Sequence, residues 1–168
     1  NLEDLEALQA EVKEAYPEQE CLIHWVDFAE KEETITYGHD IQAIWPDIDL
    51  LVNNVGVFLP GSVHGEGDGS LESTMTLNLY SPYYLTRTLL PGMMKRKTGH
   101  IINMCSIASF MSYPNGGSYT ISKFALLGLS KVLREEMKPH GIKVTSIMPG
   151  ATWSASWGEA PFALDRLM

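Results

Sequence analysis

Apolar residues change their spacing along the chain in a regular way. Residues 2–15 place them three or four apart among acidic residues, which predicts a helix with one apolar stripe made of Leu2, Leu5, Leu8 and Val12. Residues 21–26 and 48–52 are short apolar runs and predict buried strands, and the polar stretch between them predicts a helix to about Trp45. The first third of the chain is therefore predicted as helix, strand, helix, strand.

The same alternation continues to the end of the chain. It predicts a glycine-rich surface loop over 61–70, a long helix over 71–97 with bends near Pro82 and Pro91, a strand over 100–105, a helix over 118–138 and a strand over 143–148. Strands that alternate with amphipathic helices predict an α/β fold with a parallel sheet and helices on both faces.

In such sheets ligands bind at the carboxyl ends of the strands. The predicted strands end at Asp27-Phe28, Asn53 to Gly56, Cys105-Ser106 and Pro149-Gly150, so these residues are expected to line one crevice. The acids in Gly65-Glu66-Gly67-Asp68-Gly69 would repel a phosphate, and this segment is therefore predicted to be a surface loop without a ligand.

Composition narrows the class of protein. A chain of 168 residues that is 45% hydrophobic predicts one globular domain over 1–168. Its formal charge of -9 argues against nucleic acid or an anionic membrane as a partner, and it has no apolar run of the ~18 to 20 residues that span a bilayer. A cytoplasmic location, reduced Cys21 and Cys105 thiols and no metal site are the resulting expectations.

The most informative motif is Tyr119-Thr-Ile-Ser-Lys123, because residues four apart share one face of a helix. A free tyrosine has a pKa of about 10, so it is a useful proton donor near neutrality only where its phenolate is stabilised. The Lys123 ammonium would provide that stabilisation. Taken alone, however, the same pair is also typical of a solvated helix edge.

Several further motifs occur in a fixed order around this pair, and together they resemble the short-chain dehydrogenase/reductase family. They are Asp27 after an apolar run, Asn53-Asn54-Val55-Gly56, Asn78 in a helix, Ser106 placed 13 residues before Tyr119, and Pro149-Gly150. Val55 is a mild departure from the alanine of the family turn. Within the family, the chain looks most like bacterial oxidoreductases of unassigned substrate.

The resemblance implies a Rossmann fold, NAD or NADP as cofactor, and interconversion of an alcohol and a ketone or aldehyde. It implies four catalytic residues, Asn78, Ser106, Tyr119 and Lys123, with Tyr119 as the proton donor, Ser106 orienting the substrate, Lys123 stabilising the phenolate and Asn78 holding a water. The implied cofactor contacts are Asp27, Phe28, Asn53, Asn54, Val55, Gly56, Tyr119, Lys123, Pro149, Gly150 and Thr152. Family members pack the helices at 71–97 and 118–138 between subunits, which implies a homodimer or homotetramer.

Several alternatives stay open from the sequence. Asn78 could instead bond the backbone, Ser106 could merely end a strand, and Asp27 could cap the next helix while also binding adenine. The loop residues Met111, Tyr113, Trp153 and Trp157 could receive an apolar substrate, cap the core or meet a partner.

The family's glycine-rich turn and first two strands are not found in these 168 residues. The chain is therefore expected to be part of a longer reductase, with roughly 40 residues missing at the front and a comparable length behind, and by itself to bind cofactor poorly. The competing hypothesis is a truncated relative that keeps the fold for binding or oligomerisation and performs no catalysis.

Overall fold

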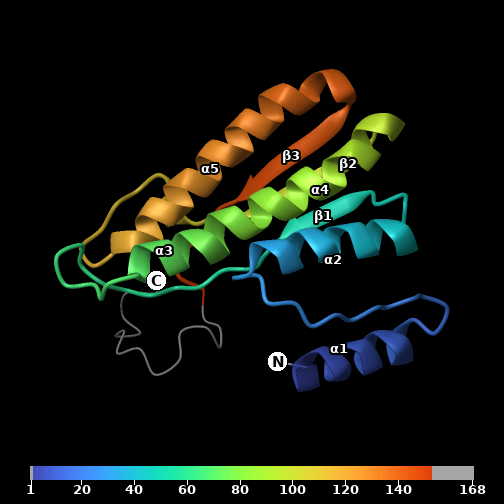
Figure 1. Cartoon of the computed structure of the whole chain (residues 1–168), viewed down its shortest axis with the longest axis horizontal. Helices are drawn as coiled ribbons and strands as arrows, with labels where there is room; N and C mark the ends of the chain where they lie inside the picture. The colour runs from blue at the N-terminus through green and yellow to red at the C-terminus, as the bar shows by residue number, and fades with distance from the viewer. Residues whose placement is uncertain (1, 153–168) are drawn as a thin grey trace.

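The computed structural model describes residues 2–152, and its elements follow the predicted alternation (Figure 1). The helices are α1 Leu2–Ala15, α2 Lys31–Ile44, α3 Ser70–Met75, α4 Ser81–Arg96 and α5 Gly117–Met137; a π-helical turn η1 covers Thr76–Tyr80, and short 3-10 turns are η2 Ile107–Ser109 and η3 Lys138–His140. The strands are β1 Leu50–Asn53, β2 Gly99–Met104 and β3 Ile142–Ile147.

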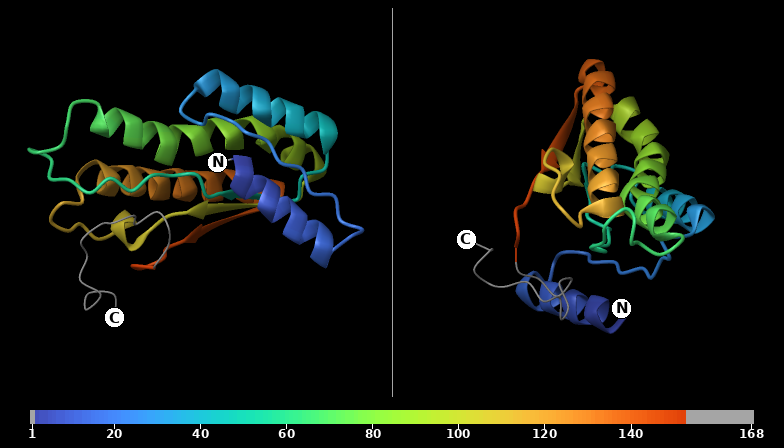
Figure 2. Two further views of the ribbon diagram at one scale, coloured as in Figure 1. Left: turned by 90° about the horizontal axis from the view of Figure 1, so that it is seen from below. Right: turned by 90° about the vertical axis from the view of Figure 1, so that its left-hand side faces the viewer.

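The strands form one parallel sheet in the order β1-β2-β3, with Leu51 opposite Ile101 and Ile101 opposite Val144. Helices α2, α4 and α5 all cover the same face of this sheet (Figure 2). The strands alternate accordingly, because Leu51, Ile101 and Val144 are buried under the helices while Leu50 and Val52 on the other face are about half exposed. The predicted Rossmann-like α/β class with a parallel sheet is confirmed. The prediction of helices on both faces is not met within residues 2–152, where α2, α4 and α5 cover one face and the other face carries half-exposed side chains.

Two packing features hold this layer of helices against the sheet. The main core lies between α4, α5 and the strands, and its buried side chains are Leu51, Leu89, Met93, Ile101, Leu133, Met137, Ile142 and Val144. Helix α2 packs closely on α4 at Gly38, where a Cβ atom would lie only 2.8 Å from Cγ2 of Thr88. A side chain at Gly38 would therefore push α2 away from α4.

The strand predicted over 21–26 does not form, and this prediction is wrong: residues 20–27 have no regular secondary structure. Within residues 2–152 no other strand pairs with this segment, and a lone strand leaves its backbone groups unpaired. Trp25 in this segment is 66% exposed. Helix α1, which precedes it, forms as predicted, but its apolar stripe stays largely uncovered, with Leu2 and Leu8 about half exposed.

The long helix predicted over 71–97 is interrupted by the π-helical turn η1. The Ser81 N–H bonds the carbonyl of Thr76, five residues back, instead of the one four residues back. Pro82 follows directly and has no N–H to donate, which favours a change of hydrogen-bond register at this point. The π-helical turn lies where the sequence analysis predicted a bend near Pro82, and α4 continues through Pro91 to Arg96. None of the helices formed by residues 2–152 has the length and apolar character needed to cross a membrane.

Candidate active site

The carboxyl ends of the strands meet at one edge of the sheet, as predicted for three of the four segments. Because β1, β2 and β3 are parallel and in register, Asn53 to Gly56, Cys105-Ser106 and Pro149-Gly150 leave the sheet on the same side. The Ile107 N–H donates to the Pro149 carbonyl over 3.1 Å and ties two of these ends together. The fourth segment, Asp27-Phe28, does not follow a strand, although α2 begins at this end of the sheet (Figure 1).

Asn78 lies fully buried in the π-helical turn η1, and its amide joins two other parts of the site. Its Oδ1 accepts from the Val57 N–H over 2.8 Å, and its Nδ2 donates to the Val57 carbonyl over 3.1 Å. The same Nδ2 donates to the Ser122 hydroxyl over 2.9 Å, and that hydroxyl donates to the Tyr119 carbonyl over 2.7 Å. Asn78 therefore links the loop after β1 to the backbone of Tyr119.

Lys123 is a buried cation beside this chain of hydrogen bonds. The residue is only 8% exposed, and its ammonium donates to the Met104 carbonyl over 2.8 Å, at the end of β2. Burial lowers the pKa of Lys123, and the charge of the neighbouring Cys105 acts in the opposite direction. The structure shows no carboxylate within ion-pair distance of Lys123 among residues 2–152. A buried amine with a perturbed pKa and no acidic partner is typical of a functional site.

Gly56 brings the backbone close to these two side chains. A Cβ atom at this position would lie 2.8 Å from Oδ1 of Asn78 and 3.7 Å from Nζ of Lys123. A Cβ atom would clash with the Asn78 amide oxygen, so glycine at this position allows the backbone of the loop after β1 to lie directly against Asn78 and near the Lys123 ammonium.

The Tyr119 ring lies on the face of α5 that the motif predicted. The Lys123 Nζ atom is 5.8 Å from the ring centroid of Tyr119, and the Phe58 ring packs against it edge-on with centroids 4.8 Å apart. Burial raises the pKa of the nearby Tyr113 phenol, and the charge of Tyr119 raises it further. The structure thus brings Tyr119, Lys123 and Asn78 together.

Ser106 stands at the end of β2 with an extended backbone and begins the short turn η2. Its hydroxyl accepts from the Ala108 N–H over 3.1 Å, and its own N–H donates to the Ser109 hydroxyl over 3.1 Å. Within residues 2–152 the Ser106 hydroxyl acts only as an acceptor, so its proton stays available to a ligand.

The remaining residues predicted to contact the cofactor differ in what their side chains do. Asn53 is buried under the helices, where its Nδ2 donates to Thr86 and Asn103, so it faces the core and not the crevice. Asn54 and Val55 are exposed. The Thr152 hydroxyl is exposed and donates to the Gly150 carbonyl over 3.3 Å.

Asp27 and Phe28 lie in the segment just before α2 and contact that segment and the helix. The Asp27 carboxylate accepts from the Ala29 N–H over 2.9 Å, which forms a local turn, and Phe28 packs edge-on against Tyr37. Asp27 is therefore a turn former in this structure, while the N-cap of α2 is Glu30.

Two side chains to which the sequence analysis assigned no role, Ser122 and Glu66, form hydrogen bonds beside the site. Ser122 directly precedes Lys123, and a helical serine often bonds a carbonyl one turn back, so its spacing was a usable signal. Glu66 bonds Ser118 across 52 residues, and no local pattern predicts such a pair. Of the four loop residues proposed to meet a substrate, Met111 and Tyr113 are exposed, and Trp153 and Trp157 lie outside the described residues.

Comparison with known proteins identifies the family. The sequence profile of the short chain dehydrogenase family matches residues 1–161, and the chain belongs to this family. The predicted family is therefore confirmed.

Similar relatives include the estradiol 17-beta-dehydrogenase 11 of Pongo abelii, 32% identical over 127 residues, a match that covers 74% of this chain and 42% of that protein. An uncharacterized oxidoreductase of Bacillus subtilis is also 32% identical, over 79% of this chain and 47% of that protein. The chain thus spans about half the length of the curated relatives it matches. Because a steroid dehydrogenase and an oxidoreductase without an assigned substrate match equally well, sequence identity does not select a substrate.

A solved metagenomic short-chain oxidoreductase in complex with NADP superimposes with a TM-score of 0.83 at 31% identity, over 90% of this chain and 68% of that one. Its bound NADP agrees with the predicted cofactor class of NAD or NADP.

Proposed function

We propose that the protein is an NAD- or NADP-dependent oxidoreductase that interconverts an alcohol and a ketone or aldehyde, with Tyr119 as the general acid and base. The observation that supports this most is the joint placement of Tyr119, Lys123 and Asn78. The phenol has a buried cation on its own helix face, and the Tyr119 backbone is tied to Asn78 through Ser122.

The chemistry assigns one task to each side chain. When bound, the nicotinamide supplies the hydride that converts a carbonyl carbon into the carbon of an alcohol. Tyr119 donates its phenolic proton to the carbonyl oxygen as negative charge develops there, and the resulting phenolate is stabilised by the Lys123 ammonium. The Ser106 hydroxyl donates a hydrogen bond to the same oxygen and fixes its position. In the oxidative direction Tyr119 takes the proton back.

The residues around Gly56 suit a nicotinamide ribose. The backbone at Gly56 lies near the Lys123 ammonium, which has donors left after its bond to the Met104 carbonyl. We therefore place the ribose hydroxyls next to Lys123, and the backbone of Asn54 to Gly56 and of Pro149-Gly150 along the nucleotide. The choice between NAD and NADP is not part of the proposal.

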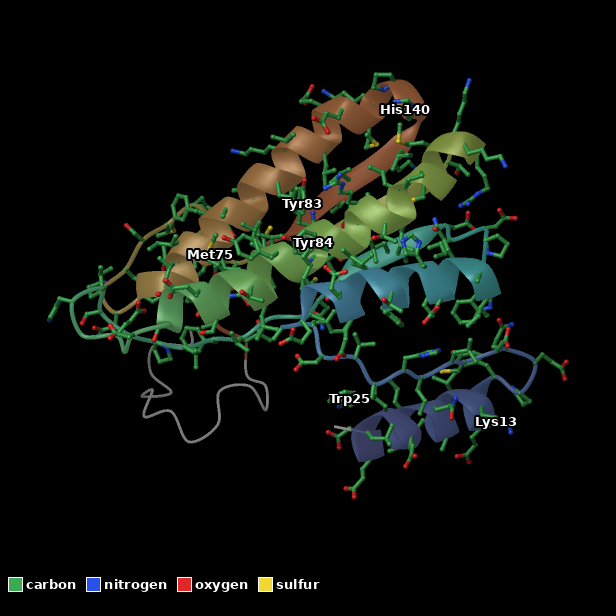
Figure 3. The ribbon with its side chains drawn as sticks, viewed as in Figure 1. Lys13, Trp25, Met75, Tyr83, Tyr84 and His140 are labelled. Atoms are coloured by element: carbon green, nitrogen blue, oxygen red, sulfur yellow. The ribbon has the colours of Figure 1, made fainter. Side chains whose placement is uncertain are left out.

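A homodimer or homotetramer built on α4 and α5 is also proposed. Both helices carry exposed apolar side chains, and a shallow apolar groove between them is lined by Leu79, Tyr80, Tyr83, Tyr84, Ala125 and Leu129. Figure 3 shows Tyr83 and Tyr84 on α4 beside α5. The cytoplasmic location stays a prediction from the sequence.

The decisive experiment measures NADH and NADPH oxidation over a panel of ketones and aldehydes, with the protein expressed from its full native reading frame. Tyr119→Phe removes only the phenolic hydroxyl and is expected to lower kcat by about 10²- to 10⁴-fold. Tyr16→Phe is the matched control, because Tyr16 lies just after α1 and is 64% exposed. Full activity in Tyr119→Phe would refute the assigned role. A folded protein that binds nucleotide but turns over no substrate would favour the non-catalytic alternative.

A further inference from the structure

The loop between β1 and α3, residues 54–69, makes three contacts at the start of α5, at Asn115, Ser118 and Tyr119. Phe58 packs its ring edge-on against Tyr119. The Gly61 N–H donates to the Asn115 carbonyl over 3.0 Å. The Glu66 carboxylate accepts from the Ser118 N–H over 2.8 Å through Oε1, and from the Ser118 hydroxyl through Oε2. The loop is therefore joined to the segment that leads into α5 and to the first turn of the helix, up to Tyr119 itself.

Glu66 satisfies a helix end that has no cap of its own. The N-cap residue of α5 is Gly116, which has no side chain to accept from the first N–H groups of the helix. Unpaired N–H groups and the positive end of the helix dipole both favour a carboxylate at this point. The two hydrogen bonds from Ser118 lower the pKa of Glu66, so the carboxylate is the preferred form.

The backbone on both sides is shaped for this contact. The N–H groups of Gly65 and Glu66 both bond the Ser62 carbonyl, and this turn directs Glu66 toward α5. On the helix side, Gly117 has a φ of +32°, and a Cβ atom there would lie 2.0 Å from Oε1 of Glu66 and 2.4 Å from the Gly61 carbonyl oxygen. Only glycine at 117 allows the loop to approach this closely.

We propose that Glu66 is a positioning residue for the reaction: by capping α5 through Ser118, it holds the Tyr119 side chain at the place from which the proton is transferred. The inference rests on the function proposed for Tyr119. Ser118 is 2% exposed and directly precedes Tyr119, so any shift of the first turn of α5 moves the phenol with it. A displacement of about 1 Å can cost about 100-fold in rate.

The test compares Glu66→Ala, Ser118→Ala and the double variant in the protein from its full native reading frame, with Asp68→Ala as control for an exposed acid of the same loop. Each single substitution is expected to lower kcat, Glu66→Ala by about 10-fold, with little change in KM for the nucleotide. The double variant is expected to lose no more than Glu66→Ala, because both act through one contact. Glu66→Gln keeps an oxygen acceptor and is expected to restore part of kcat.

A second readout needs no catalysis. Amide hydrogen exchange of Ser118 is expected to become at least about 10-fold faster in Glu66→Ala and to stay unchanged in Asp68→Ala. This readout decides the positioning claim even if the protein turns over no substrate, so its failure is distinct from failure of the proposed function. The proposal is overturned if Ser118 exchange is unchanged in Glu66→Ala. It is also overturned if the losses of kcat in the two single variants multiply in the double variant, or if kcat per folded molecule matches that of Asp68→Ala.

Discussion

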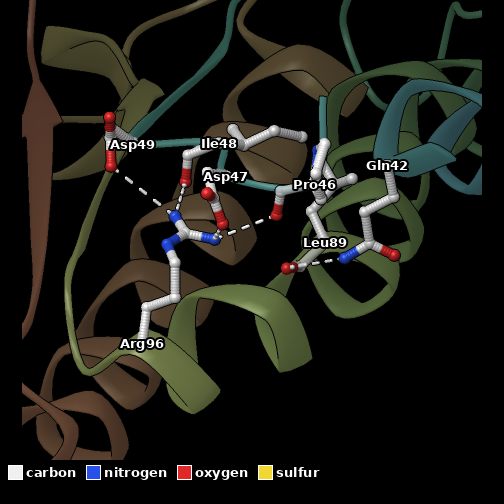
Figure 4. A network of polar contacts seen from close by, with 7 residues as sticks. All are labelled: Gln42, Pro46, Asp47, Ile48, Asp49, Leu89 and Arg96. Carbon is white, nitrogen blue, oxygen red and sulfur yellow. Dashed lines mark hydrogen bonds and ion pairs between the residues drawn. The ribbon is translucent and has the colours of Figure 1, made fainter. Parts of the chain in front are cut away.

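Two cations reach from helices to backbone carbonyls at opposite ends of the sheet, and their surroundings differ sharply. Arg96, at the end of α4, donates to the carbonyls of Pro46 and Ile48 just before β1 and lies 3.5 and 3.6 Å from the carboxylates of Asp47 and Asp49 (Figure 4). Lys123, in α5, donates to one carbonyl at the end of β2 and has no carboxylate within ion-pair distance among residues 2–152.

Exposure sharpens the contrast. The Arg96 side chain is 20% exposed and surrounded by acceptors, whereas Lys123 is 8% exposed and keeps donors that no described side chain uses. A cation with its charge balanced and its donors used stabilises the fold. A buried cation without that balance costs free energy, and such a cost is common where a ligand completes the site. Of the two, Arg96 therefore has a structural role, and Lys123 has the character of a functional residue.

The largest effect should come from Lys123→Met, which keeps the length of the side chain and removes its charge. Turnover is expected to fall by at least about 100-fold, because the Tyr119 phenolate loses its stabilising charge. The free energy of unfolding should stay the same or rise by about 1 kcal/mol, because a poorly compensated buried charge is removed. Measurements of turnover and of thermal unfolding on one preparation check both expectations. A marked loss of stability would mean that Lys123 holds the fold together as Arg96 does.

Arg96→Met should give the opposite pattern. We expect the free energy of unfolding to fall by about 2 kcal/mol, because two backbone carbonyls lose a charged donor, while kcat per folded molecule stays unchanged. Denaturant unfolding followed by activity at low temperature measures both. Asp49→Asn is the matched control: its side chain is 82% exposed, so its ion pair should contribute less than about 0.5 kcal/mol. A loss of kcat in Arg96→Met would contradict a purely structural role for Arg96 and remove its contrast with Lys123.

The smallest effect is a pH dependence of stability at pH values below the ordinary lysine pKa of 10.5. The pKa of Lys123 lies below its ordinary value of 10.5 in the folded protein. Between these two values the unfolded chain binds more protons than the folded one, so this residue makes stability rise with pH there. Its destabilising effect is complete below the folded-state pKa. The stability difference between Lys123→Met and the unaltered protein should therefore shrink as the pH rises toward 10.5. Denaturant unfolding at several pH values measures this difference, and a constant difference would show that folding does not lower the pKa of Lys123.

The sequence by itself determined the elements whose patterns are local. The apolar runs predicted β1, β2 and β3, the period of apolar residues predicted α1, and helices near α2 and α5 were predicted within a few residues. The spacing of Tyr119 and Lys123 placed both on one helix face, and the order of the motifs identified the family. These predictions succeed because periodicity and turn chemistry depend on neighbours a few residues apart.

Only the tertiary structure decided what depends on distant partners. Residues 21–26 are as apolar as a strand, yet they form none, because a strand requires a paired neighbour that residues 2–152 do not provide. Asn78 meets Ser122 across 44 residues and Glu66 meets Ser118 across 52. The sequence shows which groups are able to form hydrogen bonds, but folding selects the distant pairs that satisfy most of the buried groups, and that selection is made in three dimensions.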